Sequence, residues 1–191
     1  MNADTPPLQT GEPEFSRLQK TRALAADPVK LEANADECAL LAKRFGIAAI
    51  KHLTAQVSLE KTGAGISAKG PLEAHITQTC AVSGEDFRVT IKEELDLIFV
   101  EEAVLASRDA GEVNEDGAIE INLFADEADE IGYSGDTFDL GEAVAQSLGL
   151  AIDPYAEGPD ADAARQDAGI ADETAPSGPL ADALSEALKK K

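Results

Sequence analysis

A long alternation of apolar and polar residues is the feature that most constrains how this chain of 191 residues can fold. The alternation occurs in three runs, over residues 53–59, 66–80 and 87–99. A period of two places the apolar side chains on one face of a β-strand. Short turn sequences at 63–65 and 83–86 separate the runs. The runs therefore predict consecutive antiparallel strands with one buried face.

The second run contains Gly70 and Pro71. Proline has no backbone N–H to donate to a neighbouring strand, and glycine weakens a strand interior. We therefore expect a bulge or a bend at this point of the strand.

Residues 34–45 have the pattern of an amphipathic helix. Asn34 is a good N-terminal cap, Glu37 stands three residues further on at the capping-box position, and Gly46 follows the last turn. Apolar residues recur on one face of this segment, so the helix needs a surface to pack on.

A second helix is predicted from Asp139 to about residue 152. Its apolar residues Leu140, Val144 and Leu148 recur at helical spacing. Glu142 stands three residues after Asp139, in a capping-box-like position, and Pro154 stops the helix.

These elements place the chain in the α+β class. We expect an antiparallel sheet of about 4–6 strands, curved and with a barrel-like form as one option, with two main helices beside it. The aromatic residues all lie between Phe15 and Tyr155, which predicts a single domain over residues 14–155. Within it, the acidic residues 101–118 predict a mobile loop, and Ile119 to Leu123 a further short strand.

The two ends of the chain are poor in large apolar residues. Residues 1–13 are polar and contain proline, and residues 156–178 consist mainly of Ala, Asp, Gly and Pro. These compositions predict a disordered arm and a disordered acidic linker. Leucines spaced four apart in residues 179–191 predict a short amphipathic helix that needs a docking partner.

Charge divides the chain into two unlike halves. Residues 1–70 carry nine Lys and Arg against eight acids, whereas residues 71–191 carry seven against 29. The second half therefore repels a polyanion, so that RNA can approach only the first half. A solvated acidic surface is the simpler interpretation of the same distribution.

A candidate RNA-facing patch consists of six basic residues of the first half: Arg17, Lys20, Arg22, Lys43, Arg44 and Lys51. No aromatic residue accompanies them for base stacking, because Phe45 belongs to the apolar helix face. We expect weak or indirect contact with RNA, and the alternative is that these are scattered solvated bases.

Asp139 and Glu142 form a candidate partner-facing acidic helix start. Their carboxylates suit a Lys or Arg of a partner protein. Capping the helix is by itself a sufficient role for both residues.

The sequence contains no pattern that predicts a catalytic, cofactor or metal site. Cys38 and Cys80 lie on apolar faces, which predicts buried thiols rather than reactive ones. His52 and His75 do not have a metal-ligand spacing. Glycine motifs for nucleotides and nucleophile motifs are also missing. We expect neither an enzyme nor a cofactor, a metal or a small-molecule substrate.

The N-terminus has no basic region followed by an apolar run. No apolar stretch of the sequence approaches the roughly 18 residues that span a bilayer. With only two cysteines, the chain has no disulfide framework. We therefore expect a cytoplasmic protein with no membrane partner.

In their order along the chain, these segments resemble the YceD-like family of large ribosomal RNA subunit accumulation proteins. The resemblance rests on the strand ending in Cys80, the Phe87 strand, the helix start Phe138-Asp-Leu-Gly-Glu142 and the segment Leu148-Gly-Leu-Ala-Ile-Asp-Pro-Tyr155. The closing Pro179 to Lys189 is similar to the tail of the family's alphaproteobacterial branch.

The resemblance implies a non-enzymatic accessory role in the accumulation or processing of large-subunit ribosomal RNA. We expect the acidic half to bind a basic ribosomal protein or assembly factor, with ribosomal RNA (rRNA) contacted weakly or indirectly. The alternative is a general acidic protein-interaction adaptor with only an indirect link to RNA. Many family members have Cys-x-x-Cys where this chain has Cys80 and Ser83, so a zinc or redox site does not carry over.

Overall fold

The computed structural model describes residues 13–109 and 128–169. The chain divides into two units. The first comprises Met1–Thr77 and Arg88–Asp153, and the second comprises Gln78–Phe87 and Pro154–Lys191. The sequence predicted a single domain over residues 14–155, but residues 78–87 group with the chain from Pro154 onward. A backbone hydrogen bond from Ala81 N to Ala156 O, at 3.1 Å, is one cause of that grouping.

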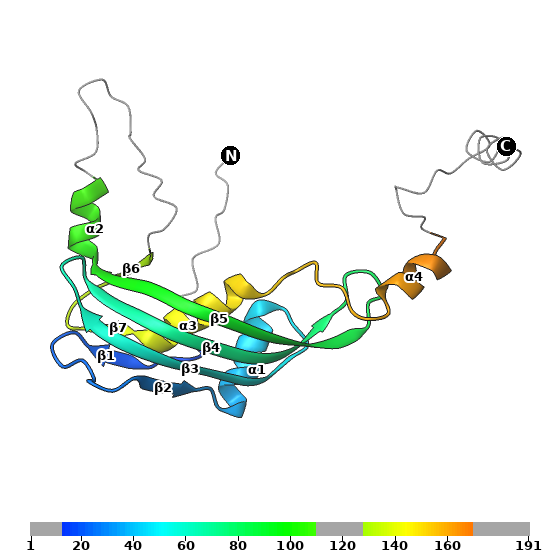
Figure 1. The fold of residues 1–191 in the computed structure, drawn as a ribbon, viewed down its shortest axis with the longest axis horizontal. Coiled ribbons are helices and arrows are strands. Elements are labelled where there is room, and N and C mark those ends of the chain that lie inside the picture. Colours follow the sequence, from blue (N-terminus) through cyan, green and yellow to red (C-terminus); the bar gives the residue numbers. More distant parts are fainter. Residues whose placement is uncertain (1–12, 110–127, 170–191) are drawn as a thin grey trace, which may run out of the picture. The chain divides into compact units, whose positions relative to one another are not determined.

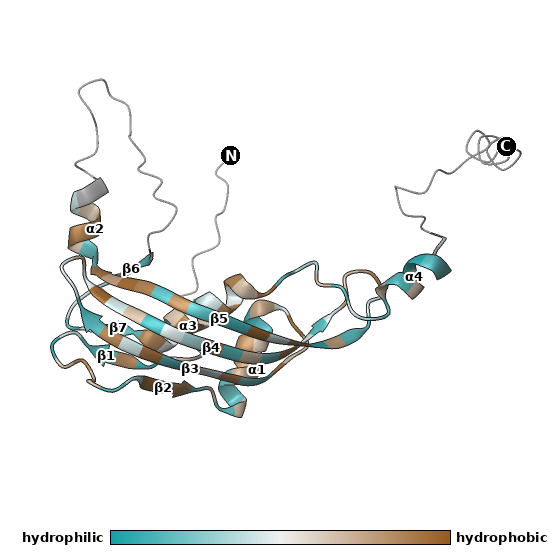
Figure 2. Cartoon of the chain, viewed as in Figure 1, coloured by the Kyte–Doolittle hydropathy of each residue, from teal (hydrophilic) through white to brown (hydrophobic). Residues whose placement is uncertain are grey.

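The first unit is built on a five-stranded sheet (Figure 1). The strand order is β2 (Val29–Glu32), β3 (Ala49–Lys61), β4 (Ile66–Thr79), β5 (Asp86–Glu101) and β6 (Asp129–Tyr133). The three long strands follow the alternation predicted from the sequence, and bands of opposite hydropathy alternate along them (Figure 2). Among the described residues the sheet is open, with β2 and β6 at its edges, and it does not close into a barrel.

One pairing departs from the antiparallel prediction. β2 and β3 are antiparallel, as are β3 and β4, but β6 runs parallel to β5. A separate antiparallel pair joins β1 (Leu18–Lys20) to β7 (Thr137–Asp139). The sequence analysis assigned none of β1, β2, β6 and β7, because strands this short are decided by distant pairing partners rather than by their own pattern.

The interruption at Gly70 and Pro71 leaves the register of the β3/β4 pair unchanged. Pairing steps from Ser58 with Lys69 to Ala55 with Leu72, so no residue is inserted and there is no bulge at this point. Gly70 has φ of 149°, and a Cβ there would lie 2.1 Å from the Gln56 backbone oxygen, so only glycine fits this close approach. The register shift in this pair lies instead between Ile50 and His52.

Helix α1 (Ala35–Phe45) begins and ends as predicted. The Asn34 side chain accepts the backbone N–H groups of Asp36 and Glu37, and the Glu37 side chain accepts the N–H of Asn34, which completes the capping box. Gly46 then caps the C-terminal end.

Helix α3 (Leu140–Ala151) begins at the Asp139 cap, as predicted. Leu140, Val144 and Leu148 are fully buried. Both α1 and α3 contribute to one apolar core with the inward residues of the sheet and with Phe15 (Figure 1). The two predicted main helices therefore cover the predicted apolar sheet face.

Two further helices correct the sequence predictions. α2 (Glu102–Asp109) lies where residues 101–118 predicted a mobile loop. α4 (Ala161–Asp167) lies where residues 156–178 predicted a disordered linker. Four of the seven α4 residues are Ala or Arg, which have high helix propensity, and Arg165 pairs with Asp162 at 3.0 Å and with Glu157. Composition suggested disorder, but these local interactions stabilise a helical turn.

Three predictions lie outside the described residues: the disordered arm, apart from Pro13, the strand over residues 119–123, and the helix over residues 179–191. In the described part, no helix is long and apolar enough to cross a membrane.

Candidate functional site

Arg17 of the predicted basic patch is held by groups of its own unit. Its guanidinium donates to the two carboxylate oxygens of Glu37, at 2.7 and 2.9 Å, and to the backbone oxygen of Glu32 at 3.1 Å. It also lies 4.5 Å from the ring centre of Phe15. The hydrogen bond from Arg17 lowers the pKa of Glu37 below its ordinary value. Arg17 therefore joins the N-terminal segment to the start of α1.

Arg44 forms a second internal ion pair of the same unit. Its guanidinium donates to both carboxylate oxygens of Glu142, at 2.7 and 2.9 Å, and to Glu14 at 3.0 Å. Burial opposes ionisation of Glu142, but the hydrogen bonds from Arg44 and Gln146 outweigh it, and the pKa of Glu142 is lowered. This pair connects the last turn of α1 to the first turn of α3.

The carboxylate of Asp139 accepts four hydrogen bonds. It accepts the Ser16 hydroxyl at 2.5 Å and the backbone N–H groups of Arg17, Gly141 and Glu142 at 2.8, 3.0 and 3.1 Å. Glu142 does not complete a capping box and bonds Arg44 instead. Both carboxylates of the predicted acidic helix start are thus engaged inside the protein.

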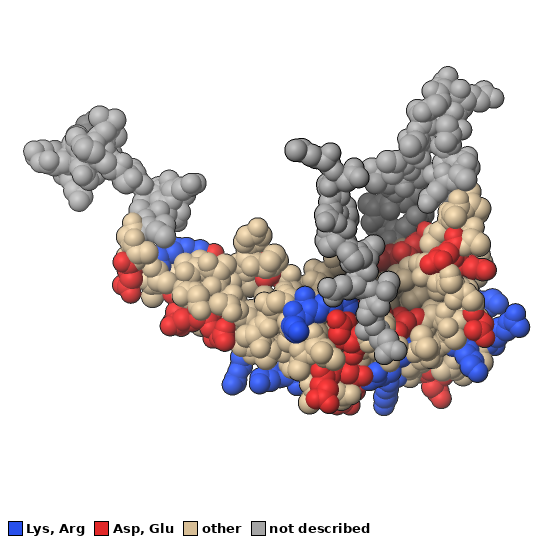
Figure 3. All heavy atoms as spheres, turned by 180° about the vertical axis from the view of Figure 1, so that it is seen from behind, with Lys and Arg blue, Asp and Glu red and all other residues tan. Residues whose placement is uncertain are grey.

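The other four residues of the basic patch are exposed. Lys20 lies in β1, Arg22 follows it, Lys43 is in the last turn of α1, and Lys51 is in β3. The structure therefore divides the six predicted residues into two internally paired arginines and four exposed bases on different elements. On the face drawn in Figure 3, basic and acidic side chains are interspersed. An uninterrupted basic surface for RNA is not seen on that face.

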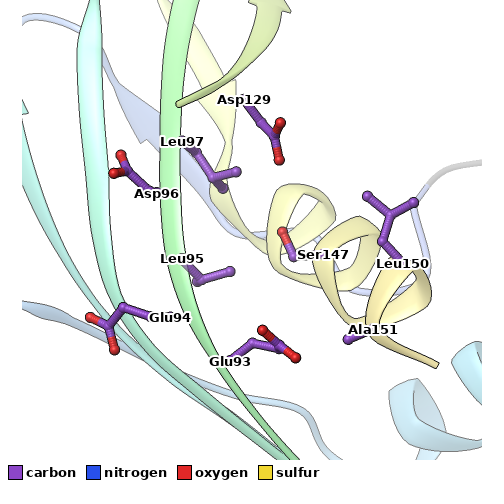
Figure 4. Close-up of a pocket in the computed structure, with 9 residues that line it drawn as sticks. All are labelled: Glu93, Glu94, Leu95, Asp96, Leu97, Asp129, Ser147, Leu150 and Ala151. Carbon is purple, nitrogen blue, oxygen red and sulfur yellow. The ribbon is translucent and has the colours of Figure 1, made fainter. Parts of the chain in front are cut away.

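A groove of about 280 Å³ runs between β5 and α3 (Figure 4). We call it the β5/α3 groove, and nine residues line it: Glu93, Glu94, Leu95, Asp96, Leu97, Asp129, Ser147, Leu150 and Ala151. All nine belong to the first unit. Leu95 and Leu97 point from β5 toward α3, whereas Glu94 and Asp96 point away from it (Figure 4). The groove therefore has an apolar floor formed by one face of the strand.

Acidic and apolar side chains meet at the rim of the β5/α3 groove. Glu93 and Asp129 project on the same side of β5 as α3 (Figure 4). Neither forms an ion pair within residues 13–109 and 128–169, whereas Asp96 pairs with Lys69 at 2.8 Å. Leu150 of α3 also lines the groove, and 84% of its surface is exposed. An exposed leucine beside unpaired carboxylates suits a ligand that is both apolar and basic.

The sequence analysis did not identify this groove, although it contains one signal. Glu93 occupies an odd position between Ile91 and Leu95, where the alternation predicts an apolar residue. A charged residue on the apolar face of a strand marks a point where that face is not covered. Glu93, Asp129 and Leu150 come from three different elements and line the same groove. The sequence pattern alone does not predict that they come together.

Cys80 lies in the second unit with only 3% of its surface exposed, so its burial was predicted correctly. Its sulfur accepts the backbone N–H groups of Val82, Ser83 and Gly158, at 3.4, 3.3 and 3.2 Å. Hydrogen bonds from the Ser83 side chain, and then from these N–H groups, lower the pKa of Cys80 to about 7. The described residues contain no group of three or more His, Cys, Asp or Glu side chains placed to hold a metal ion.

A family model described as large ribosomal RNA subunit accumulation protein YceD matches residues 68–186. The matched range includes most of β4, all of β5 and α3, and the turn that follows Cys80. Neither the curated proteins nor the solved structures yield a significant match.

Proposed function

The chain belongs to the YceD family of large ribosomal RNA subunit accumulation proteins, and we propose that it acts in the cytoplasm as a non-enzymatic accessory factor for that accumulation. In this proposal the chain binds a basic ribosomal protein or assembly factor, and rRNA is contacted weakly or indirectly. The family match, which spans more than half of the chain, supports the link to large-subunit rRNA.

A basic protein partner is supported by a difference between acidic and basic residues. Two acidic residues of the β5/α3 groove have no ion pair among the described residues, whereas two arginines of the predicted basic patch are paired within the protein. Glu93 and Asp129 face the β5/α3 groove without an ion pair in the described part of the chain. Arg17 and Arg44, in contrast, are already paired with carboxylates. A surface of this kind attracts Lys and Arg side chains and repels phosphates.

The same imbalance argues against strong direct RNA binding. Neutralised phosphates release counterions, so that affinity depends on how many free Lys and Arg face the nucleic acid. Only Lys20, Arg22, Lys43 and Lys51 of the predicted patch are exposed and not held by internal acids. A protein partner therefore explains the charge distribution better than rRNA does.

Retention of purified ribosomal proteins on the immobilised full-length chain tests this proposal. We expect one or a few basic large-subunit proteins to be retained at physiological salt and released as the salt concentration rises. An unrelated acidic protein of similar net charge is the matched control, and it should retain none of them selectively. If that control retains the same proteins equally well, or if the chain retains none, the partner proposal is wrong.

The same immobilised full-length chain can be used to measure direct binding to RNA. Affinity for large-subunit rRNA fragments should be weak, and Lys20→Ala/Arg22→Ala should change it little. Tight binding with a steep dependence on salt would show that the chain is primarily an RNA-binding protein.

A further inference from the structure

We propose that the β5/α3 groove receives an extended, basic segment of a partner protein, which adds to the open edge of β5 as an additional strand. This inference rests on the proposed function and deepens it, because it names where the basic partner binds and in what conformation.

The first argument is the open edge of β5. β6 pairs with β5 only over Leu97–Glu101. Among the described residues, no strand pairs with β5 over 88–96 on that side. An unpaired edge presents a row of backbone N–H and C=O groups, and adding a peptide strand to such an edge is a recurrent mode of recognition. Asp129, the first residue of β6, marks where the existing pairing stops.

The second argument is that the side chains on the groove side of this edge suit one kind of sequence. Glu93, Leu95 and Leu97 point from β5 toward α3, and Leu150 of α3 also lines the β5/α3 groove. An incoming strand places every second side chain over this surface. Lys or Arg would face Glu93 and Asp129, and apolar side chains would pack against the exposed Leu150. The complementary segment therefore mixes basic and aliphatic residues.

The third argument concerns the chain's own residues next to β6. Residues 118–127 read Ala-Ile-Glu-Ile-Asn-Leu-Phe-Ala-Asp-Glu, with three acids and no Lys or Arg. Placing Glu120, Asp126 or Glu127 beside Glu93 and Asp129 is electrostatically unfavourable. Charge complementarity thus favours a basic segment of another protein over this segment.

The test uses the full-length chain and three synthetic ten-residue peptides as probes. The first alternates lysine and valine. The second is the same peptide with alternate backbone nitrogens methylated, which removes the strand-forming donors and keeps the charge. The third alternates glutamate and valine. Binding is measured by fluorescence anisotropy at low and physiological salt, and amide hydrogen exchange is measured with and without each peptide.

We expect the lysine–valine peptide to bind and to slow exchange of alternate amides within residues 88–96, and the other two peptides to bind at least about tenfold more weakly. Glu93→Gln/Asp129→Asn should weaken binding by about fivefold, given the small contribution of each exposed ion pair. Leu150→Ser should also weaken it, without loss of stability, because Leu150 is exposed. Asp27→Asn/Glu60→Gln removes the same charge at exposed positions elsewhere and should leave binding unchanged.

Four results would overturn the inference. Equal binding of the methylated peptide, or equal binding to both double variants, would mean non-specific attraction to an acidic surface. Slow exchange in the free chain of those 88–96 amides that do not bond β4 would mean that the chain itself covers this edge. Absence of peptide binding would mean that Glu93 is a charge that only prevents other chains from pairing with this strand edge.

The two proposals fail separately. If the peptide experiment fails while ribosomal proteins are still retained by the chain, the groove assignment is wrong and the proposed function stands. If the lysine–valine peptide binds as expected but no ribosomal protein is retained, the proposed function is wrong and the groove remains a docking site.

Discussion

The carboxylate of Asp139 accepts the backbone N–H of Arg17 at 2.8 Å, across 122 residues of sequence. The same oxygen atom accepts the N–H groups of Gly141 and Glu142 and so caps α3. The β1/β7 pair places Leu18 opposite Asp139. One side chain therefore begins the helix and fixes the N-terminal segment on it.

Asp139→Ala should lower the free energy of unfolding by about 3 kcal/mol, because it removes a helix cap and leaves a part-buried N–H of Arg17 without its acceptor. Asp139→Asn keeps an acceptor oxygen and should cost about 1 kcal/mol. Urea-induced unfolding of both variants measures the difference. Equal losses for the two variants would mean that the charge of Asp139, rather than its hydrogen bonds, carries its effect.

Gly141→Ala should destabilise the protein although alanine is the better helix former. A Cβ at position 141 would lie 2.5 Å from the backbone oxygen of Phe15 and 2.8 Å from the backbone nitrogen of Arg17. Neither group can move without separating the N-terminal segment from α3, so we expect a loss of about 2–4 kcal/mol.

Gly149→Ala in the same helix is the matched control. There the Cβ would meet the Phe45 ring at 3.0 Å, and a side chain can shift. We expect a change of less than about 1 kcal/mol, because the gain in helix propensity offsets that contact. Thermal and urea unfolding of both variants test the pair. If Gly141→Ala is as stable as Gly149→Ala, the N-terminal segment does not pack on α3 in the way described.

Both helices that cover the sheet were predicted from their ends. Asn34, Glu37 and Gly46 are local signals for α1, and Asp139 is the local signal for α3, because caps act within a few residues. The long strands were predicted because the alternation in each places most of the apolar side chains on one face, despite Gly70-Pro71 in β4 and Glu93 in β5. The parallel strand β6 was not predicted, since its pairing with Leu97 to Glu101 is determined by contacts about 30 residues away.

The candidate site was less predictable than the fold. Arg17 and Arg44 were expected to face RNA because of their charge, but Arg17 pairs with Glu37, 20 residues away, and Arg44 pairs with Glu142, 98 residues away. With so many acidic residues, some ion pairs within the chain are expected. The composition does not say which Lys or Arg residues form them. The β5/α3 groove needed the structure for the same reason, because its two sides come from distant segments.

Acid should destabilise the protein through Glu37 and Glu142, whose pKa values are lowered in the folded state. A depressed folded pKa contributes stability that is complete above the unfolded pKa of about 4.3 and is lost as the pH falls through the folded value. We expect stability to decline from about pH 5 toward pH 3.

Unfolding free energies measured across this pH range test the assignment. Glu37→Gln/Glu142→Gln should be less stable at neutral pH and should show a flatter decline, because its neutral side chains no longer titrate. Asp27→Asn/Glu60→Gln, at exposed positions outside these pairs, should keep the decline of the wild type. If all three proteins show the same slope, other acids dominate the acid sensitivity.

Cys80 should titrate with a midpoint near pH 7, because the Ser83 side chain and three backbone N–H groups stabilise its thiolate. Thiolate absorbance in the ultraviolet follows this step. Cys80→Ser should abolish it, since burial raises the pKa of the remaining Cys38. Ser83→Ala should move the midpoint upward, and an unmoved midpoint would mean that Ser83 does not stabilise the thiolate.

The ratio of large-subunit to small-subunit rRNA in cells that lack this chain tests the central claim most directly. The proposed function predicts that the ratio falls relative to the parent strain and that the wild-type chain restores it. A basic partner bound in the β5/α3 groove predicts in addition that Glu93→Gln/Asp129→Asn restores it less well than Asp27→Asn/Glu60→Gln at equal protein levels. A ratio that stays unchanged when the chain is removed would contradict a role in large-subunit rRNA accumulation.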